Sequence, residues 1–196
     1  MREDSLTILL TGASRSGKTT VCTKVIDLAR AAGVTVGGIV TENAVTESGA
    51  VVQHVVDVRT GRRSLLATAT AERARVVARY EGVERPLHAD EFAASWVFDE
   101  GGVAFGNAAL VATITTPCEL LVVDQIGPLE LRAGAGFDAA FDAVLRGRHE
   151  VALVVVHPLV LELAERRFPG RRQVFEVGAD VRDGLPQTIM ALCRRR

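Results

Sequence analysis

Residues 6–19, "LTILLTGASRSGKT", join an apolar run to a glycine-containing loop and then to the start of a helical pattern. The loop from Gly12 to Thr19 matches G-x-x-x-x-G-K-[ST] at every fixed position. Such a loop wraps a phosphate with successive backbone N–H groups, and the positive end of the following helix points at the same phosphate. With an apolar strand before it and a helix after it, the loop predicts a nucleoside-phosphate site.

The side chains of this loop have separate expected roles. Lys18 is expected to reach the β- and γ-phosphates, and the Thr19 hydroxyl to coordinate Mg²⁺. The chain's lysines are Lys18 and Lys24, among 23 lysines and arginines together, so a lysine in the loop indicates that an ammonium is needed there. The residues predicted to bind the phosphates are Gly12, Ala13, Ser14, Arg15, Ser16, Gly17, Lys18, Thr19 and Thr20.

The rest of the chain alternates short apolar runs with amphipathic stretches, which is typical of βαβ proteins with a mostly parallel sheet. We expect strands at 6–12, 34–42, 119–124, 151–156 and 172–177, and helices at 17–32, 106–116, 136–147, 158–168 and 181–194. Residues at about 48–68 predict an antiparallel β-hairpin insertion, and 70–104 form a variable segment. The predicted fold class is α/β, with one P-loop domain over 1–196 that forms a three-layer α/β/α sandwich.

Composition narrows the classes of function. The chain has 196 residues, of which 48% are hydrophobic and 24% charged, which is ordinary for a globular protein. A net charge of −1 gives no general reason to expect nucleic-acid binding. Three scattered cysteines favour a reducing compartment, and the apolar runs are too short to span a membrane. We therefore expect a cytoplasmic protein that acts away from membranes and nucleic acid, and leave a protein partner open.

A second motif lies in "LLVVDQIGPLEL", residues 120–131, where an apolar strand ends in an acid. Downstream of a phosphate loop, Asp124 is where such proteins place the acid that supports the metal, so we predict a Mg²⁺ site at Thr19 and Asp124. A strand-end aspartate also serves as a cap, which is the alternative. Gln125 follows, where many enzymes that hydrolyse nucleoside triphosphates place a glutamate. A glutamine cannot take a proton, but it can orient water.

The segments "GASRSGKTT", "GGIVTE" and "VVDQIGPLEL" come in this order. Together they resemble the small nucleoside-triphosphatase family known from thermophilic microbes and, in humans, as cancer-related nucleoside triphosphatase. The family's "GFYTEE" and "DEIG-x-ME" elements are matched here at Gly38, Thr41, Glu42, Asp124, Ile126, Gly127 and Glu130. The resemblance implies a RecA-like fold and slow, Mg²⁺-dependent hydrolysis of several nucleoside triphosphates, ATP and GTP among them, to diphosphate and phosphate.

The chain departs from the family pattern at Gln125, which replaces a glutamate, and at Asn43, which replaces the second acid of "TEE". The predicted catalytic residues are Lys18, Gln125, Glu130 and Glu42. Of these, the two glutamates are carboxylates that could stand in for the missing acid, or ordinary surface acids. His157, after 151–156, is either a sensor of the γ-phosphate or a cap of the following helix.

Three functions remain open at this point. The leading one is a Mg²⁺-dependent nucleoside-triphosphatase whose activity is reduced by Gln125. The second is a nucleotide-binding switch or partner-regulated module that leaves the triphosphate intact. The third is a kinase that transfers the γ-phosphate to a small molecule or nucleotide. An Asn-Lys-x-Asp guanine-reading sequence is absent from the chain, so a GTP-specific enzyme is not expected.

Overall fold

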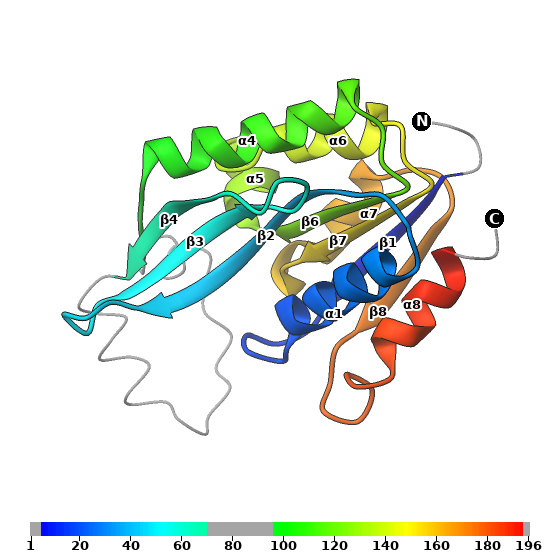
Figure 1. Ribbon diagram of the computed structural model, residues 1–196, viewed down its shortest axis with the longest axis horizontal. Helices are drawn as coiled ribbons and strands as arrows, with labels where there is room; N and C mark the ends of the chain where they lie inside the picture. The colour runs from blue at the N-terminus through cyan, green and yellow to red at the C-terminus, as the bar shows by residue number, and fades with distance from the viewer. Residues whose placement is uncertain (1–4, 70–95, 194–196) are drawn as a thin grey trace.

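The computed structural model describes residues 5–69 and 96–193, which are built around one eight-stranded sheet of order β5-β4-β3-β2-β6-β7-β1-β8 (Figure 1). Five neighbouring strands pair in parallel. They are β2 (Val36–Val45), β6 (Leu120–Ile126), β7 (Val151–Val156), β1 (Leu6–Thr11) and β8 (Arg172–Glu176). The predicted parallel sheet is confirmed.

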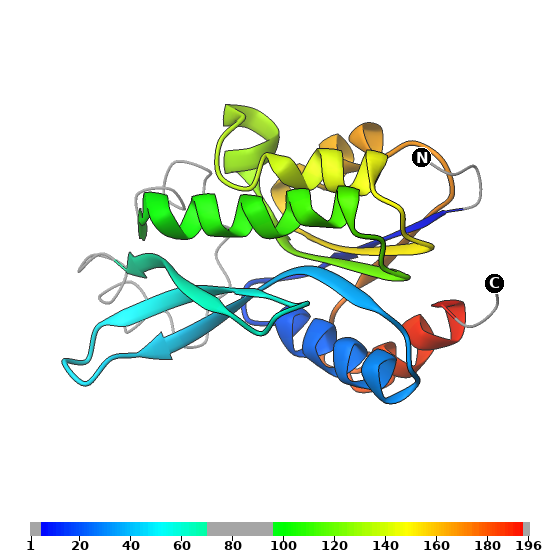
Figure 2. The same ribbon diagram turned by 45° about the horizontal axis from the view of Figure 1, so that its top comes forward.

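Helices cover both faces of the sheet. In Figures 1 and 2, α1 (Lys18–Ala31) and α8 (Leu185–Cys193) lie on one face, while α4 (Glu100–Thr115) and α6 (Ala139–Arg146) lie on the other. Three short helices follow strand ends: α5 (Pro128–Ala133), the 3-10 helix η1 (Pro158–Val160) and α7 (Leu161–Arg167). The three-layer α/β/α sandwich is confirmed. Within the described residues, every helix is too short or too polar to cross a membrane.

Two hydrophobic cores lie on opposite faces of the sheet. Strands β1 and β7 are buried at every position, as expected for parallel strands covered on both sides. Side chains alternate between the faces, so Leu9 and Val154 pack in the core beneath α4 and α6, whereas Leu10 and Val155 pack in the core beneath α1 and α8. This double burial fixes the strand ends that carry the site.

Three antiparallel strands extend the sheet beyond β2: β3 (Val51–Asp57), β4 (Arg63–Ala69) and β5 (Trp96–Phe98). The hairpin predicted at 48–68 is confirmed as β3 and β4. Strand β2 is longer than the predicted 34–42, because it continues to Val45 and pairs there with β3. The hairpin is therefore a continuation of the main sheet and not a separate appendage.

Gly38 lies in the part of β2 that pairs with β6, one residue before the strand also begins to pair with β3. The φ of Gly38 is +106°, and a Cβ there would lie 1.9 Å from the carbonyl oxygen of Val122. Only glycine tolerates both the left-handed backbone and this close approach to the neighbouring strand.

Helix α4 begins earlier than the predicted residue 106, at Glu100. Asp99 caps the helix, since its Oδ1 accepts a hydrogen bond from the backbone N–H of Gly102 at 2.7 Å. Glycines in the first turns hid this start, because glycine is a poor helix former. Gly102 is needed for packing, as a Cβ there would lie 1.8 Å from the carbonyl oxygen of Leu65 on β4. Residues 70–95 of the predicted variable segment lie outside the described part of the chain.

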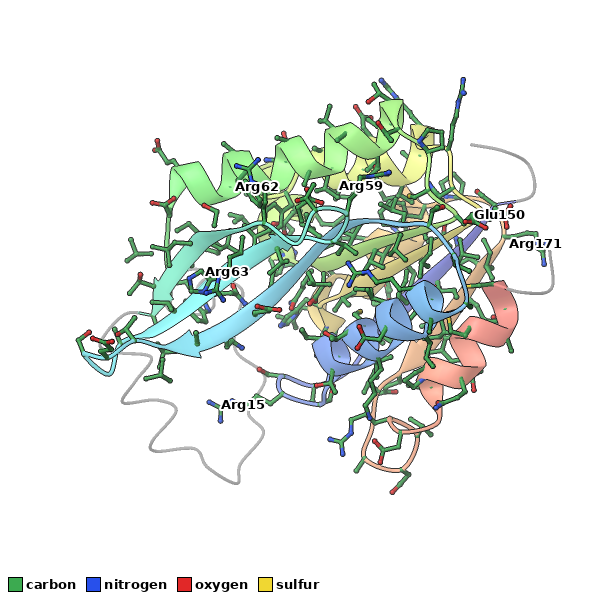
Figure 3. All side chains as sticks on the ribbon, in the orientation of Figure 1. Arg15, Arg59, Arg62, Arg63, Glu150 and Arg171 are labelled. Carbon is green, nitrogen blue, oxygen red and sulfur yellow. The ribbon has the colours of Figure 1, made fainter. Side chains whose placement is uncertain are left out.

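The turn between β3 and β4 is attached to α4 by arginines. The Arg59 Nη2 donates to the carbonyl oxygen of Thr116 at 2.8 Å, and the Arg62 guanidinium lies 5.9 Å from the centre of the Phe105 ring. Both side chains are labelled in Figure 3, between the turn and the helix. These contacts hold the antiparallel strands against the α/β core.

Candidate nucleotide site

The phosphate loop leaves the carboxyl end of β1 and enters α1. Gly12, Arg15 and Gly17 have positive φ angles of 136°, 63° and 98°. At Gly12 a Cβ would lie 2.7 Å from the carbonyl oxygen of Val177, so the loop is packed against the chain that follows β8. Gly17 precedes α1 and has no side chain with which to cap it. The N–H groups of the first helical turn therefore remain available to an anion.

Lys18 lies inside the loop and is held by it. Its Nζ donates to the carbonyl oxygens of Gly12 at 2.7 Å and Ala13 at 2.6 Å. Burial lowers the pKa of Lys18, and the nearby carboxylate of Asp124 opposes that change. Phosphate oxygens are stronger acceptors for an ammonium than neutral carbonyls, so a bound phosphate could replace these partners.

Asp124 lies at the end of β6 and is completely buried. Its Oδ2 accepts hydrogen bonds from the Thr19 hydroxyl at 2.8 Å and from the N–H and hydroxyl of Thr41, both at 3.3 Å. Its Oδ1 is buried and has no hydrogen-bond partner among the residues that the structure describes. Burial raises the pKa of Asp124, while the hydrogen bonds from Thr19 and Thr41 and the charge of Lys18 act in the opposite direction.

This arrangement fits a divalent metal. The Thr19 hydroxyl donates a hydrogen bond to Asp124, so the lone pairs of its oxygen can face a cation. A buried carboxylate oxygen without a partner can accept a hydrogen bond from a metal-bound water. In the described part of the chain no group of three or more His, Cys, Asp or Glu could hold a metal ion by itself. The donors present instead suit an ion that takes some of its ligands from the protein and the others from substrate phosphates and water, as Mg²⁺ does.

Gln125 reaches the same side of the sheet as the loop because β6 is irregular there. Val123 pairs with Val154 and Ile126 pairs with Val156, so two residues of β6 lie opposite one residue of β7. The Asp124–Gln125 peptide bond is cis. In a regular strand neighbouring side chains point to opposite faces, whereas a bulge re-aims one of them. Gln125 is half-buried and faces a cavity beside the phosphate loop.

The cavity has a volume of about 650 Å³ and extends from the phosphate loop to the antiparallel strands. Its lining includes Lys18, Thr19 and Gln125, and also Asn43 on β2 and Gln53 on β3. The last two residues face each other across β2 and β3. In the sequence Asn43 stands out only as a departure from the family pattern, and Gln53 does not stand out. Alternate residues of a strand share one face, so Thr41 and Asn43 on β2 face the cavity together, as do Val51 and Gln53 on β3. This alternation is the pattern by which the sequence could have indicated Gln53.

The two predicted glutamates lie in different places. Glu130 is buried at the start of α5, where its Oε2 accepts from the N–H of Gly127 at 2.8 Å and its Oε1 from the N–H of Phe137 at 3.1 Å. Burial raises the pKa of Glu130. Glu130 also borders the cavity, but both of its carboxylate oxygens accept hydrogen bonds from backbone N–H groups. Its geometry is that of a helix cap.

Glu42 is exposed on β2 between Thr41 and Asn43, which both line the cavity. Because neighbouring side chains of a strand point to opposite faces, Glu42 points away from the cavity. The structure therefore does not bring Glu42 into the site. The expectation that β2 ends there is also wrong, since the strand continues to Val45.

His157 follows β7 and lines the cavity near Gln125. Its Nδ1 accepts a hydrogen bond from the N–H of Leu159 at 3.2 Å, so the capping interpretation is confirmed. Trp96 belongs to the hydrophobic core and also borders the cavity. Arg15 is exposed and extends from the loop away from α1 (Figure 3).

A phosphate loop between a buried strand and a helix, with a buried acid on a nearby strand end, defines the class of P-loop nucleotide-binding α/β proteins. The family described as NTPase matches residues 7–190 of the chain. The chain belongs to this family of nucleoside-triphosphatase enzymes.

Individual relatives agree with this assignment. The chain is 31% identical to the nucleoside-triphosphatase THEP1 of Methanopyrus kandleri over 93% of its own length and 92% of the relative's. It is 32% identical to the THEP1 of Methanothermobacter thermautotrophicus over 94% of both chains. Its fold is similar to the solution structure of a human cancer-related nucleoside triphosphatase, with a TM-score of 0.68 at 21% identity over 97% of this chain and 98% of that one. The crystal structure of THEP1 from Aquifex aeolicus gives a TM-score of 0.59 at 19% identity, over 96% and 99%.

Proposed function

We propose that this protein slowly hydrolyses nucleoside triphosphates, ATP and GTP among them, to diphosphate and phosphate with the help of Mg²⁺. The observation that carries the proposal is the contact between the Thr19 hydroxyl and the buried Asp124 at 2.8 Å, beside a phosphate loop. The names of the relatives support hydrolysis as the reaction.

In this proposal the loop N–H groups and the first turn of α1 hold the phosphates. Lys18 leaves the carbonyls of Gly12 and Ala13 and pairs with β- and γ-phosphate oxygens. Thr19 would contact the metal directly, and Asp124 would orient Thr19 and a metal-bound water. When bound, Mg²⁺ would neutralise charge on the β- and γ-phosphate oxygens.

In this proposal Gln125, which lines the cavity together with Lys18 and Thr19, orients the attacking water. Its amide can accept a hydrogen bond from the water and donate one to a γ-phosphate oxygen, although it cannot remove the proton. In a loose phosphoryl-transfer transition state positioning matters more than proton removal, so turnover is retained but slow. A neutral amide also repels the triphosphate less than a carboxylate would, which favours tight binding.

Gln125 also favours one alternative function, a nucleotide-binding switch with little hydrolysis, because its amide cannot remove a proton from the water. A kinase is the other alternative, favoured by a cavity lining that includes Asn43 and Gln53 on the antiparallel strands in addition to the phosphate loop, where a phosphate acceptor could bind.

Phosphate release from Mg-ATP and Mg-GTP, measured without any acceptor, tests the proposal. We expect slow, multiple-turnover release that stops with EDTA and falls to background in Lys18→Ala. Tight binding of Mg-ATP without phosphate release would overturn hydrolysis in favour of the switch. Release that requires an added acceptor would favour the kinase.

A further inference from the structure

The antiparallel strands carry a row of side chains that reaches the cavity. Asn43 of β2 lies opposite Gln53 of β3. Gln53 in turn lies opposite Ala67 of β4, and Ala67 lies opposite Phe98 of β5. Residues directly opposite one another in antiparallel strands share one face of the sheet. The pairing therefore brings Asn43, Gln53 and Phe98, from three different strands, to the lining of the cavity.

The part of the lining that these strands supply is uncharged. Six of its residues form what we call the antiparallel wall: Asn43, Val51, Gln53, Leu66, Trp96 and Phe98. Two of the six carry neutral amides and four carry aliphatic or aromatic side chains, whereas the phosphate loop brings the cations of Arg15 and Lys18 to the same cavity. The cavity therefore combines a site for an anion with a wall suited to a neutral molecule.

The two amides of the wall are placed to contact one ligand. Because Asn43 and Gln53 lie directly opposite each other, their Cβ atoms are expected to be about 4.5–5.5 Å apart. Asn43 is exposed and Gln53 is half-buried, and neither side-chain amide hydrogen-bonds to another residue within 5–69 and 96–193. An amide presents a donor and an acceptor side by side, which complements the edge of a nucleobase.

Apolar side chains next to the amides supply a surface for the face of a flat ring. Val51 and Phe98 are each 37% exposed, although both are large apolar residues. Leu129 of α5 and Phe137, which follows α5, also line the cavity. Stacking on an aromatic side chain is a main source of affinity for nucleobases. The wall thus offers amides to the edge of a base and Phe98 to its face.

The wall begins beside the predicted metal site. Thr41 donates to Asp124 through its N–H and its hydroxyl, and Asn43 is the next residue of β2 on the same face. In the proposed function the γ-phosphate lies beside Gln125, on the strand paired with β2. The nucleoside of a triphosphate is attached at the α-phosphate, at the other end of the phosphate chain. A ring on the antiparallel wall therefore belongs to a second molecule.

We propose that the antiparallel wall binds the base of a separate nucleoside while a triphosphate occupies the phosphate loop. Asn43 and Gln53 hydrogen-bond to the edge of the base, and Phe98 stacks on its face. The inference rests on the proposed function for the location of the γ-phosphate. The nucleoside lies next to that phosphate, so the two ligands share one cavity of about 650 Å³, within the range of about 300–1,000 Å³ typical of small-molecule sites.

Calorimetric titration of adenosine and of guanosine into the protein saturated with a non-hydrolysable Mg-ATP analogue tests the inference. We expect at least one of the two nucleosides to bind the loaded protein without displacing the analogue, and ribose alone not to bind. Trp96 is the only tryptophan of the chain and belongs to the wall, so nucleoside binding should also change the tryptophan fluorescence.

Three substitutions remove the proposed contacts one at a time. Asn43→Leu and Gln53→Met remove the amides at nearly constant size, and Phe98→Leu removes the aromatic face but stays apolar. We expect each to weaken nucleoside binding about 5- to 100-fold, with the analogue affinity and the melting temperature close to those of the wild type. His54→Gln is the matched control, because His54 follows Gln53 on β3 and points to the opposite face. Its nucleoside affinity should equal that of the wild type.

Failure of both nucleosides to bind the loaded protein would overturn the inference, and so would wild-type nucleoside affinity in both amide variants. Competition between nucleoside and analogue would also overturn it, because the base would then occupy the position of the triphosphate's own nucleoside. Phosphate release is measured separately. Release without nucleoside binding removes only this inference, and nucleoside binding without release removes only the proposed hydrolysis.

Discussion

Two buried carboxylates, at the end of β6 and at the start of α5, are used in opposite ways. Both Glu130 oxygens accept backbone N–H groups, which closes the turn after β6. One oxygen of Asp124 accepts hydrogen bonds from Thr19 and Thr41, and the other has no partner among the described residues. A satisfied buried acid stabilises local structure, whereas an incompletely satisfied one beside a phosphate loop can hold a ligand. Burial alone therefore does not identify a functional acid.

Asp124→Asn gives the largest expected effect and tests the functional side of the comparison. Loss of the charge weakens metal binding through Thr19, so kcat/KM should fall about 100-fold. The melting temperature without nucleotide should stay the same or rise, because a buried charge has been removed. Phosphate-release kinetics over a range of Mg²⁺ concentrations and a thermal melt check both. If Asp124→Asn lowers the melting temperature while the folded fraction keeps wild-type kcat/KM, Asp124 stabilises the fold and does not support metal binding.

Glu130→Gln applies the same chemical change to the structural acid. The glutamine can accept from one of Gly127 and Phe137, but its NH₂ group faces the other donor. We expect a loss of about 2 kcal/mol in the free energy of unfolding, measured in urea, and a kcat/KM within about threefold of the wild type. A stable protein with greatly reduced turnover would instead make Glu130 a participant in the chemistry.

His149 extends the comparison to the opposite end of the strands. It is buried, its Nδ1 has no partner among the described residues, and burial lowers its pKa to about 4. His149 takes up a proton near pH 6.5 in the unfolded chain, but only near pH 4 in the folded chain. The free energy of unfolding is therefore unaffected by His149 above pH 6.5 and decreases as the pH falls from 6.5 toward 4. Between pH 7 and 5.5 the loss should be about 1 kcal/mol.

The control for this third prediction is His149→Gln, which cannot titrate. Denaturant unfolding at several pH values should show a weaker acid dependence in the variant. Parallel pH profiles for the two proteins would mean that His149 does not remain neutral in the fold.

Gln125→Glu has the smallest expected effect. An acid beside the γ-phosphate can take the proton of the attacking water, so kcat should rise about two- to fivefold, with some loss of triphosphate affinity from repulsion. Single-turnover phosphate release separates the two changes. If kcat stays the same, Gln125 does not contact the attacking water.

The sequence was most informative where neighbouring residues determine the structure. The phosphate loop is a local motif, and continuous apolar runs such as 151–156 predict the buried parallel strands. The start of α4 was missed because its first turns contain glycines, of which Gly102 packs closely against β4. The three-residue strand β5 is too short to produce a pattern.

The candidate site divides in the same way. Lys18 and Thr19 follow from the motif, and Asp124 from the strand end in front of it. The cap formed by Glu130 depends on the position of the Phe137 N–H, and the orientation of Glu42 depends on how far β2 continues beyond residue 42. Both are set by the tertiary structure, so residue type and spacing could not reveal them.

The strand order also has a consequence for synthesis on the ribosome. Strand β1, made first, lies between β7 and β8, which are made last, and the Thr19–Asp124 contact joins residues 105 positions apart. The phosphate loop therefore emerges long before either strand that supports it and before the acid that orients its threonine. A nascent chain cannot complete the nucleotide site until β6, β7 and β8 have been translated. Nucleotide can therefore act as a folding ligand only after β8 has emerged from the ribosome.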